Sequence, residues 1–172
     1  MTVHGLKLTF LGPPQVELAG RPVAINRRKA LAILAYLAVT GQPQRRDTLA
    51  LLLWPESTPD AARKALRRDL SELNLALGGR WLDAEREQIC LHPGFQLDVI
   101  QFQQHLDACA ADPALCSQEL EQAVTLYRGD FLNGFTLTDS PAFDEWQFFQ
   151  RESLRQLYAR YGDSAAGRIG AV

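Results

Sequence analysis

The sequence has few of the residues that build disulfide frameworks, metal centres and membrane spans. Its 172 residues include only three cysteines, Cys90, Cys109 and Cys116, and their spacing contains no Cys-x-x-Cys pair. The spacing therefore predicts neither a disulfide framework nor a zinc site, and we expect small buried thiols. No uncharged apolar run approaches the roughly 18 to 20 residues of a membrane span, and the N-terminus lacks the layout of a signal peptide. We expect a cytoplasmic protein that does not enter a membrane.

Signatures of catalysis and of cofactor binding are also missing. The three histidines, His4, His92 and His105, are scattered, and the chain has no nucleophile elbow, phosphate-cradling glycine loop or His-x-x-x-His pair. The glycines fall in expected turns, where backbone geometry already explains them. The sequence therefore predicts a protein that is not an enzyme and that uses no cofactor and no metal.

The sequence does contain enough apolar residues for a core, and its charge is unevenly distributed. Apolar residues make up 47% and charged residues 22%, as in globular chains. The net charge of −2 conceals a contrast between residues 1–97, with 13 Lys and Arg against nine Asp and Glu, and residues 98–172, with five against 11. The first part is therefore +4 and the second −6. This split predicts two modules with different partners, the basic one being the candidate for a polyanion.

The first part of the chain has the pattern of a small α+β domain. Over residues 6–25, short alternating apolar runs separated by Gly and Pro predict a small antiparallel sheet. From Arg27 a densely apolar helical period predicts a buried helix that ends at Gly41. A second helix is expected to begin near Asp47 and to stop before Pro55.

A third helix, 59–77, has the clearest start signal, with Thr58 as N-cap and Pro59 in the first turn. Its apolar residues form one stripe toward a core: Ala62, Leu66, Leu70, Leu73 and Leu77. The residues on the opposite side are basic or polar: Lys64, Arg67, Arg68 and Ser71. Because the major groove of DNA admits one helix and its flanking phosphates attract cations, this pattern is typical of a recognition helix. The alternative is that the cations only solvate an exposed face.

A β-hairpin is expected after the third helix, over residues 80–91 with its tip at 84–87, closed by a returning strand at 95–97. A hairpin in this place is the layout of a winged helix-turn-helix, and Arg86 at the tip could reach a phosphate or the minor groove. Glu85 and Glu87 flank Arg86 and repel phosphate, which makes the wing contact the weakest part of this interpretation.

Residues 98–172 return to helical periodicity, with Phe102 and Leu106 in a first stripe, Leu120 and Tyr127 in a second, and a third that runs from Phe143 past Phe149. The paired amphipathic helices resemble helical-repeat modules, although no second copy recurs at a fixed period. We expect this acidic half to contact protein. The candidate surfaces, whose aromatic residues are equally typical of a core, are Asp144, Glu145, Trp146 and the loop Arg128–Phe135.

Six segments carry a family resemblance: Leu11–Pro13, Arg27–Leu31, Leu52–Glu56, Ala62–Arg68, Pro93–Phe95 and Leu126–Leu132. In this order and spacing they resemble the antibiotic-regulatory-protein (SARP) family of bacterial transcriptional activators, over roughly residues 6–161 of the chain. The resemblance implies an OmpR-type winged helix-turn-helix over 1–97. It also implies that 98–172 is the start of the helical bacterial transcriptional activation domain, an all-α segment built from tetratricopeptide-like helix pairs. Because that domain is longer in the family, a fragment or a shortened member is expected.

Carried onto this sequence, the resemblance places the family's recognition helix on residues 59–77. The DNA-binding candidates there are Arg63, Lys64, Arg67, Arg68, Ser71 and Asn74. Further candidates, as phosphate clamps or as the wing contact, are Arg27, Arg28, Arg45, Arg46 and Arg86. For the clamps, surface charge that aids solubility is the alternative. Family members often carry arginines in the later turns of this helix, where this chain has Glu72, Asn74 and Leu75, so fewer cations are available there.

The partners that the resemblance implies are double-stranded DNA and RNA polymerase, and in a longer chain also downstream ATPase and repeat domains. Promoter sites in the form of direct repeats would bring two copies together as a dimer. The predicted function is a sequence-specific DNA-binding transcriptional activator that docks through helix 59–77 and recruits through its acidic half. The alternative is a protein-interaction module whose winged helix has lost DNA binding.

Overall fold

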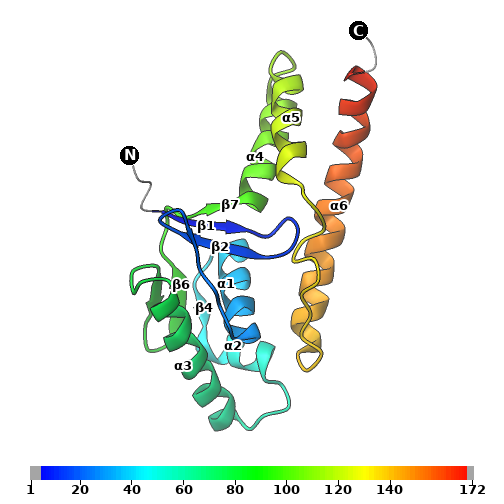
Figure 1. Ribbon diagram of the computed structural model, residues 1–172. Helices are drawn as coiled ribbons and strands as arrows, with labels where there is room; N and C mark the ends of the chain where they lie inside the picture. Colours follow the sequence, from blue (N-terminus) through cyan, green and yellow to red (C-terminus); the bar gives the residue numbers. More distant parts are fainter. Residues whose placement is uncertain (1–4, 170–172) are drawn as a thin grey trace. The chain divides into compact units, whose positions relative to one another are not determined.

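The computed structural model describes residues 5–169, which fall into two compact units (Figure 1). The first unit contains the described residues up to Leu8, together with 15–95 and 136–146. The second contains 9–14, 96–135 and the described residues from Gln147. The compact units therefore do not follow the single boundary at residue 97, because two short segments exchange places. The division into functional modules 1–97 and 98–172 remains a prediction.

The first unit begins with the small sheet that the sequence predicts. Its strands β1 (Leu6–Thr9), β2 (Gln15–Leu18) and β3 (Arg21–Pro22) lie in the order β3-β2-β1. Strands β2 and β3 are antiparallel and are joined by Ala19 and Gly20, both at positive φ. Two such residues suit a tight hairpin, because their backbone twist matches that of the strands.

The helices α1 (Arg28–Thr40) and α2 (Arg46–Leu53) follow the predicted pattern. Every residue of α1 from Ala32 to Leu34 is fully buried, and the helix ends at Gly41, whose φ of 62° lets its N–H bond the carbonyl of Leu37. Helix α2 starts one residue earlier than expected, so Asp47 lies in its first turn and does not cap it.

Helix α3 (Pro59–Ala76) is amphipathic as the sequence predicts. The hydroxyl of Thr58 accepts a hydrogen bond from the N–H of Ala61 at 3.4 Å, which confirms the N-cap. Positive φ at Gly78 and Gly79 turns the chain away after the helix. The predicted apolar stripe is buried, with no residue more than 4% exposed: Ala62, Leu66, Leu70, Leu73 and Leu77.

A second sheet in the first unit contains β4 (Gln44–Arg45), β5 (Leu82–Ala84) and β6 (Gln88–Leu91), in the order β4-β6-β5. The hairpin of β5 and β6 is the predicted wing. Residues 96–97 of the expected closing strand do form a strand, β7, but it is not part of this sheet. Strand β4 takes that place, because the extended backbone before α2 runs antiparallel along the free edge of β6.

The segment 136–146 is built into the first unit by specific contacts, although it lies far along the chain. The hydroxyl of Ser140 donates to the carbonyl of Leu53 at 2.7 Å. The ring of Trp146 lies 4.8 Å from that of Tyr36, and the N–H of Leu137 bonds the Asp144 carboxylate at 2.9 Å. Asp144 and Trp146, two of the candidate contact residues, therefore hold this segment in place.

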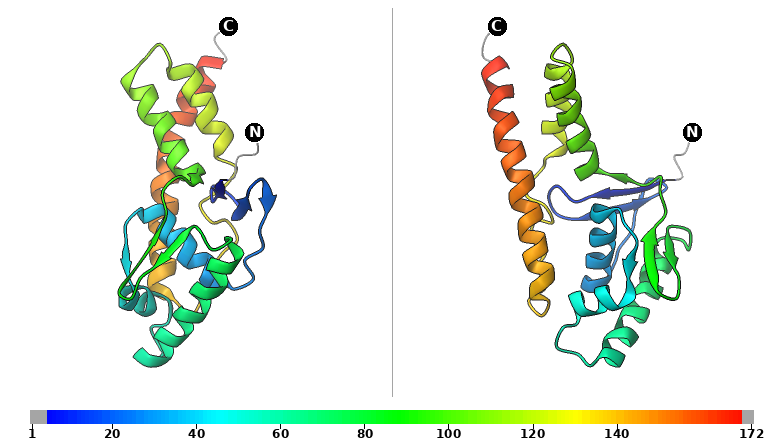
Figure 2. Two further views of the ribbon diagram at one scale, coloured as in Figure 1. Left: turned by 90° about the vertical axis from the view of Figure 1, so that its left-hand side faces the viewer. Right: turned by 180° about the vertical axis from the view of Figure 1, so that it is seen from behind.

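The second unit contains β7 (Gln96–Leu97), α4 (Asp98–Ala111), α5 (Cys116–Leu126) and most of α6 (Pro141–Ile169). Helices α4 and α5 form an antiparallel pair, as Figure 2 shows from two sides. The buried carboxylate of Asp98 accepts hydrogen bonds from the N–H groups of Phe10 and Leu11, each at 2.8 Å. Burial nevertheless raises the pKa of Asp98. These bonds explain why residues 9–14 belong to this unit.

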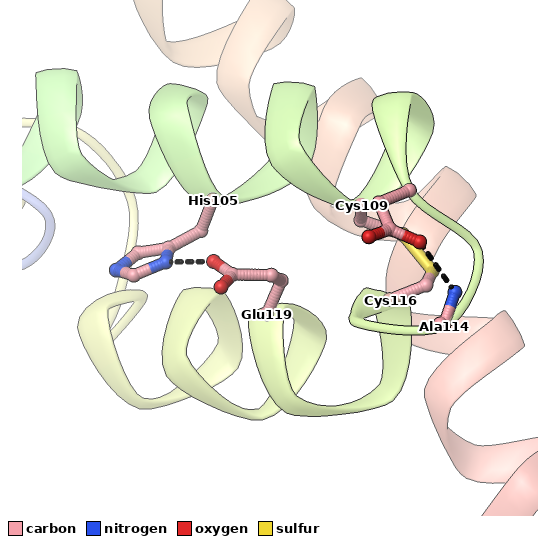
Figure 3. Close-up of a disulfide and its surroundings, with 6 residues drawn as sticks. His105, Cys109, Ala114, Cys116 and Glu119 are labelled. Carbon is pink, nitrogen blue, oxygen red and sulfur yellow. Dashed lines mark hydrogen bonds and ion pairs between the residues drawn. A yellow bond between two sulfur atoms is a disulfide. The ribbon is translucent and has the colours of Figure 1, made fainter.

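Two cross-links join α4 to α5 (Figure 3). A disulfide connects Cys109 to Cys116, and Nδ1 of His105 lies 2.5 Å from the Glu119 carboxylate. The expectation of no disulfide was wrong for this pair, although both cysteines are buried as expected. The tight turn between the helices brings the two residues together, and their separation of seven in the sequence gives no such signal.

Phe149 departs from the expected core stripe of α6, because its side chain is 60% exposed. Its neighbour Phe148 is 49% exposed, and the Arg151 guanidinium lies over that ring at 5.8 Å. Across residues 5–169, none of the helices combines the length and the hydropathy that crossing a bilayer requires.

The burial of α3 yields a first prediction, with a matched control on the same helix. Replacing Leu70, which is 3% exposed, by Ala should lower the free energy of unfolding by about 2 to 5 kcal/mol through lost transfer energy and a residual cavity. The same change at Leu75, which is 82% exposed, should cost less than about 0.5 kcal/mol. Urea unfolding followed by tryptophan fluorescence measures both, because all three tryptophans belong to the first unit. An equal loss of unfolding free energy in the two variants would contradict the assignment of Leu70 to the buried face of α3 and of Leu75 to its exposed face.

Candidate nucleic-acid interface

The first unit has a groove between the start of α2, the first half of α3 and the tip of the wing. Its volume is about 600 Å³. We call it the arginine groove, and the residues that line it are Arg45, Arg46, Asp47, Arg63, Leu66, Arg67, Arg86 and Glu87. Five of the predicted DNA-binding residues, from β4, α2, α3 and the wing tip, therefore meet in one place. Five guanidinium groups against two carboxylates leave the groove strongly positive.

Two arginines of the groove are engaged by neighbouring groups of the chain. Arg46 donates from Nε to the carbonyl of Glu85 at 2.7 Å and from Nη2 to that of Ala84 at 3.3 Å. These bonds fix the wing tip to the start of α2. Arg63 donates from Nε to Oδ1 of Asp47 at 2.9 Å, so its charge is partly neutralised.

The other cations of this face are available to a ligand. Arg45, Arg67 and Arg86 are exposed, as is Lys64 on the neighbouring turn of α3. Within residues 5–169, these four side chains make no hydrogen bond or ion pair. They can therefore meet an anion without breaking a contact in the fold. Ser71, one turn further along α3, is also exposed.

A second group of predicted DNA-binding residues lies around the start of α1. Their side chains are engaged in hydrogen bonds and ion pairs within the first unit. Asp69 is only 2% exposed and is held by Arg27 at 3.6 Å and by Arg68 at 3.3 Å. Arg27 also bonds Glu72, so Glu72 serves as its counter-charge. Arg28 donates to the carbonyl of Thr136 at 2.5 Å. A buried carboxylate needs such partners, because an unpaired buried charge is strongly destabilising.

The side chain of Asn74 is only partly exposed, and its Oδ1 is buried without a hydrogen-bond partner. Pairing with adenine requires both the oxygen and the nitrogen of the amide. Asn74, one of the predicted DNA-binding residues, therefore does not present its whole amide for such a contact.

Asp47 is the groove residue that the sequence reasoning missed as part of the site. The guanidinium of Arg63 lowers the pKa of Asp47, and the carboxylate in turn raises the pKa of Arg63. Sixteen residues separate the pair, and they lie on different helices. No local spacing rule could have brought them together.

Comparisons with known proteins give a consistent group of relatives, although no family model matches the chain. The transcriptional regulatory protein EmbR of Mycobacterium tuberculosis is 33% identical over 95 residues, which are 55% of this chain and 24% of EmbR. The transcriptional regulatory protein MoaR1 of the same organism is 24% identical over 147 residues, 85% of this chain and 45% of MoaR1. The chain thus spans less than half the length of either relative.

A solved structure of M. tuberculosis EmbR, in complex with a low-affinity phosphopeptide, matches this chain with a TM-score of 0.74. The identity is 25%, and the match covers 94% of this chain and 44% of that one. This likeness confirms the predicted fold class, an α+β winged helix-turn-helix followed by an all-α segment.

The two groups of arginines lead to a second prediction. Replacing Arg27 by Ala should lower the free energy of unfolding by about 1 to 3 kcal/mol, because buried Asp69 loses one of its two cations. Replacing Arg67 by Ala should change it by less than about 0.5 kcal/mol, since that side chain is exposed and unpaired. Urea unfolding of the full chain compares the two variants. If Arg67→Ala is the more damaging change, the division into structural and available arginines is wrong.

Proposed function

We propose that the chain is a SARP-type transcriptional regulator, as its similarity to EmbR and MoaR1 supports, and that it binds double-stranded promoter DNA sequence-specifically and activates transcription. The observation that carries the proposal is the arginine groove, in which five predicted DNA-binding residues meet beside the exposed face of α3. A single helix fits the major groove, and the cations that flank it displace condensed counterions from the phosphates.

The roles within this interface follow from which side chains are available. Arg67, Lys64 and Ser71 lie on the exposed face of α3 and are proposed to enter the major groove. Arg45 and Arg86 flank that helix from β4 and from the wing, and we assign them to phosphates on either side. Arg27, Arg28 and Arg68 contribute mainly by holding the first unit together, so their loss weakens binding indirectly.

The acidic part of the chain is proposed to contact RNA polymerase or further regulatory domains, in the bacterial cytoplasm where the DNA lies. Phe148 and Phe149 are exposed, with Arg151 over the first ring, and both residue types are enriched in protein interfaces. Glu145 is exposed beside them, whereas Asp144 and Trp146 are engaged within the fold. Two copies on direct repeats would place two such surfaces side by side.

The DNA-binding proposal is tested by fluorescence anisotropy of the full chain with short DNA duplexes over a series of salt concentrations. The logarithm of the affinity should fall linearly with the logarithm of the salt concentration, with a slope of about −0.9 per phosphate contacted. The double variant Lys64→Ala, Arg67→Ala should bind at least about tenfold more weakly, through loss of phosphate and base contacts.

The matched control is Arg21→Ala, which removes an exposed cation on β3, outside the groove. It should leave both the affinity and the salt slope nearly unchanged. If no duplex binds more tightly than roughly 10 µM at low salt, the DNA-binding proposal is contradicted and the protein-interaction alternative is favoured.

A further inference from the structure

Asp47 is one of two acidic residues, with Glu87, in a groove whose other charged residues are arginines. Its carboxylate lies 2.9 Å from Nε of Arg63, and both side chains are more than half exposed. The surrounding cations of the groove are Arg45, Arg46, Arg67 and Arg86. A groove that only held phosphates would bind them better without this carboxylate, because it offsets one of the five positive charges.

Stability does not account for the position of this ion pair. Exposed pairs of this kind contribute little to folding, since solvent and salt screen them. A carboxylate in the first turn of α2 does interact favourably with the helix dipole. That benefit requires only a carboxylate near the helix start, and it places no requirement on Arg63.

The hydrogen bond leaves one edge of the Arg63 guanidinium available. Nε donates to Asp47, which fixes the plane of the group, and the two terminal nitrogens Nη1 and Nη2 keep their outward N–H donors. Oδ1 of Asp60 lies 4.0 Å from Nη1, too far for a hydrogen bond. Two parallel donors match the O6 and N7 acceptors of guanine in the major groove.

The location of Arg63 on α3 agrees with reading a base edge. It lies in the second turn of the helix, and recognition helices present their N-terminal residues to the bases. Because Asp47 already balances its charge, Arg63 gains less from a phosphate than an unpaired arginine does, while its two terminal donors still match the two acceptors of guanine.

We propose that Asp47 is a positioning residue that holds Arg63 as a guanine reader and weakens its attraction to phosphates. The inference rests on the proposed DNA binding and specifies how the same site would distinguish sequences. Asp47 thereby lowers the affinity for DNA of any sequence and raises the preference for one sequence.

The experiment starts from a random pool of short duplexes, from which the wild-type full chain enriches a preferred sequence. The measured quantity is the ratio of the affinity for this enriched duplex to the affinity for the unselected pool. Asp47→Ala should lower the ratio about tenfold, the discrimination that one bidentate contact supplies. It should do so with unchanged or tighter binding to the pool. Asp47→Glu, which keeps the carboxylate, should restore part of the ratio.

The matched control is Asp60→Ala, which removes an equally charged neighbour of Arg63 that makes no hydrogen bond to it. Its ratio should equal that of the wild type. In a second readout, replacing the guanines of the enriched duplex one at a time by 7-deazaguanine removes the N7 acceptor. One such position should weaken the wild type severalfold and leave Asp47→Ala unaffected.

The outcomes separate this inference from the proposal on which it rests. If the wild type enriches a sequence and Asp47→Ala keeps the full ratio and the same sensitivity to 7-deazaguanine, the role of Asp47 is overturned while DNA binding stands. A ratio lowered equally by Asp60→Ala would overturn it too, since general charge would then be responsible. A wild-type chain that enriches no duplex would refute the DNA-binding proposal itself.

Discussion

Burial of one face of α3 is the constraint on which the proposed interface depends. The apolar stripe of this helix is almost completely buried, and each leucine in it contributes about 1.5 to 3 kcal/mol. Surface ion pairs contribute far less, so they cannot turn the helix to another angle. With the inner face fixed, the cations at the intervening positions have to lie on the outside. The Thr58 cap and the two glycines after Leu77 then set the ends of the helix.

The arginines of the first unit serve two purposes that composition alone does not distinguish. Arg27 and Arg68 surround the buried carboxylate of Asp69, where they satisfy a charge that would otherwise destabilise the core. The side chains of Arg45 and Arg67 are exposed and make no hydrogen bond or ion pair within the described chain. Only the second kind can release bound counterions on meeting DNA without cost to the fold. The net charge of +4 for residues 1–97 therefore does not show that the groove alone carries five arginines against two carboxylates.

Features encoded by neighbouring residues could be predicted from the sequence. The apolar stripe of α3 follows from helical periodicity. Its N-cap, and the positive φ of Gly41 after α1, follow from backbone geometry within a few residues. Features that depend on distant residues could not be predicted in this way. The pairing of β4 with β6, the insertion of residues 136–146 into the first unit and the pairing of Asp47 with Arg63 all join segments without a shared local pattern. For the same reason, the sequence pointed to the arginines that line the groove without showing which of them are already engaged.

The most direct test of the account is to observe the individual arginines while DNA binds. In a nuclear magnetic resonance titration of the ¹⁵N-labelled full chain with duplex DNA, the side-chain Nε signals report each guanidinium separately. The account predicts large shifts for Arg67 and Arg45 in the arginine groove and small ones for Arg27, which stays paired with Asp69. The largest shifts at Arg27, or shifts only in α4 and α5 with none at the arginines of the groove, would contradict the account.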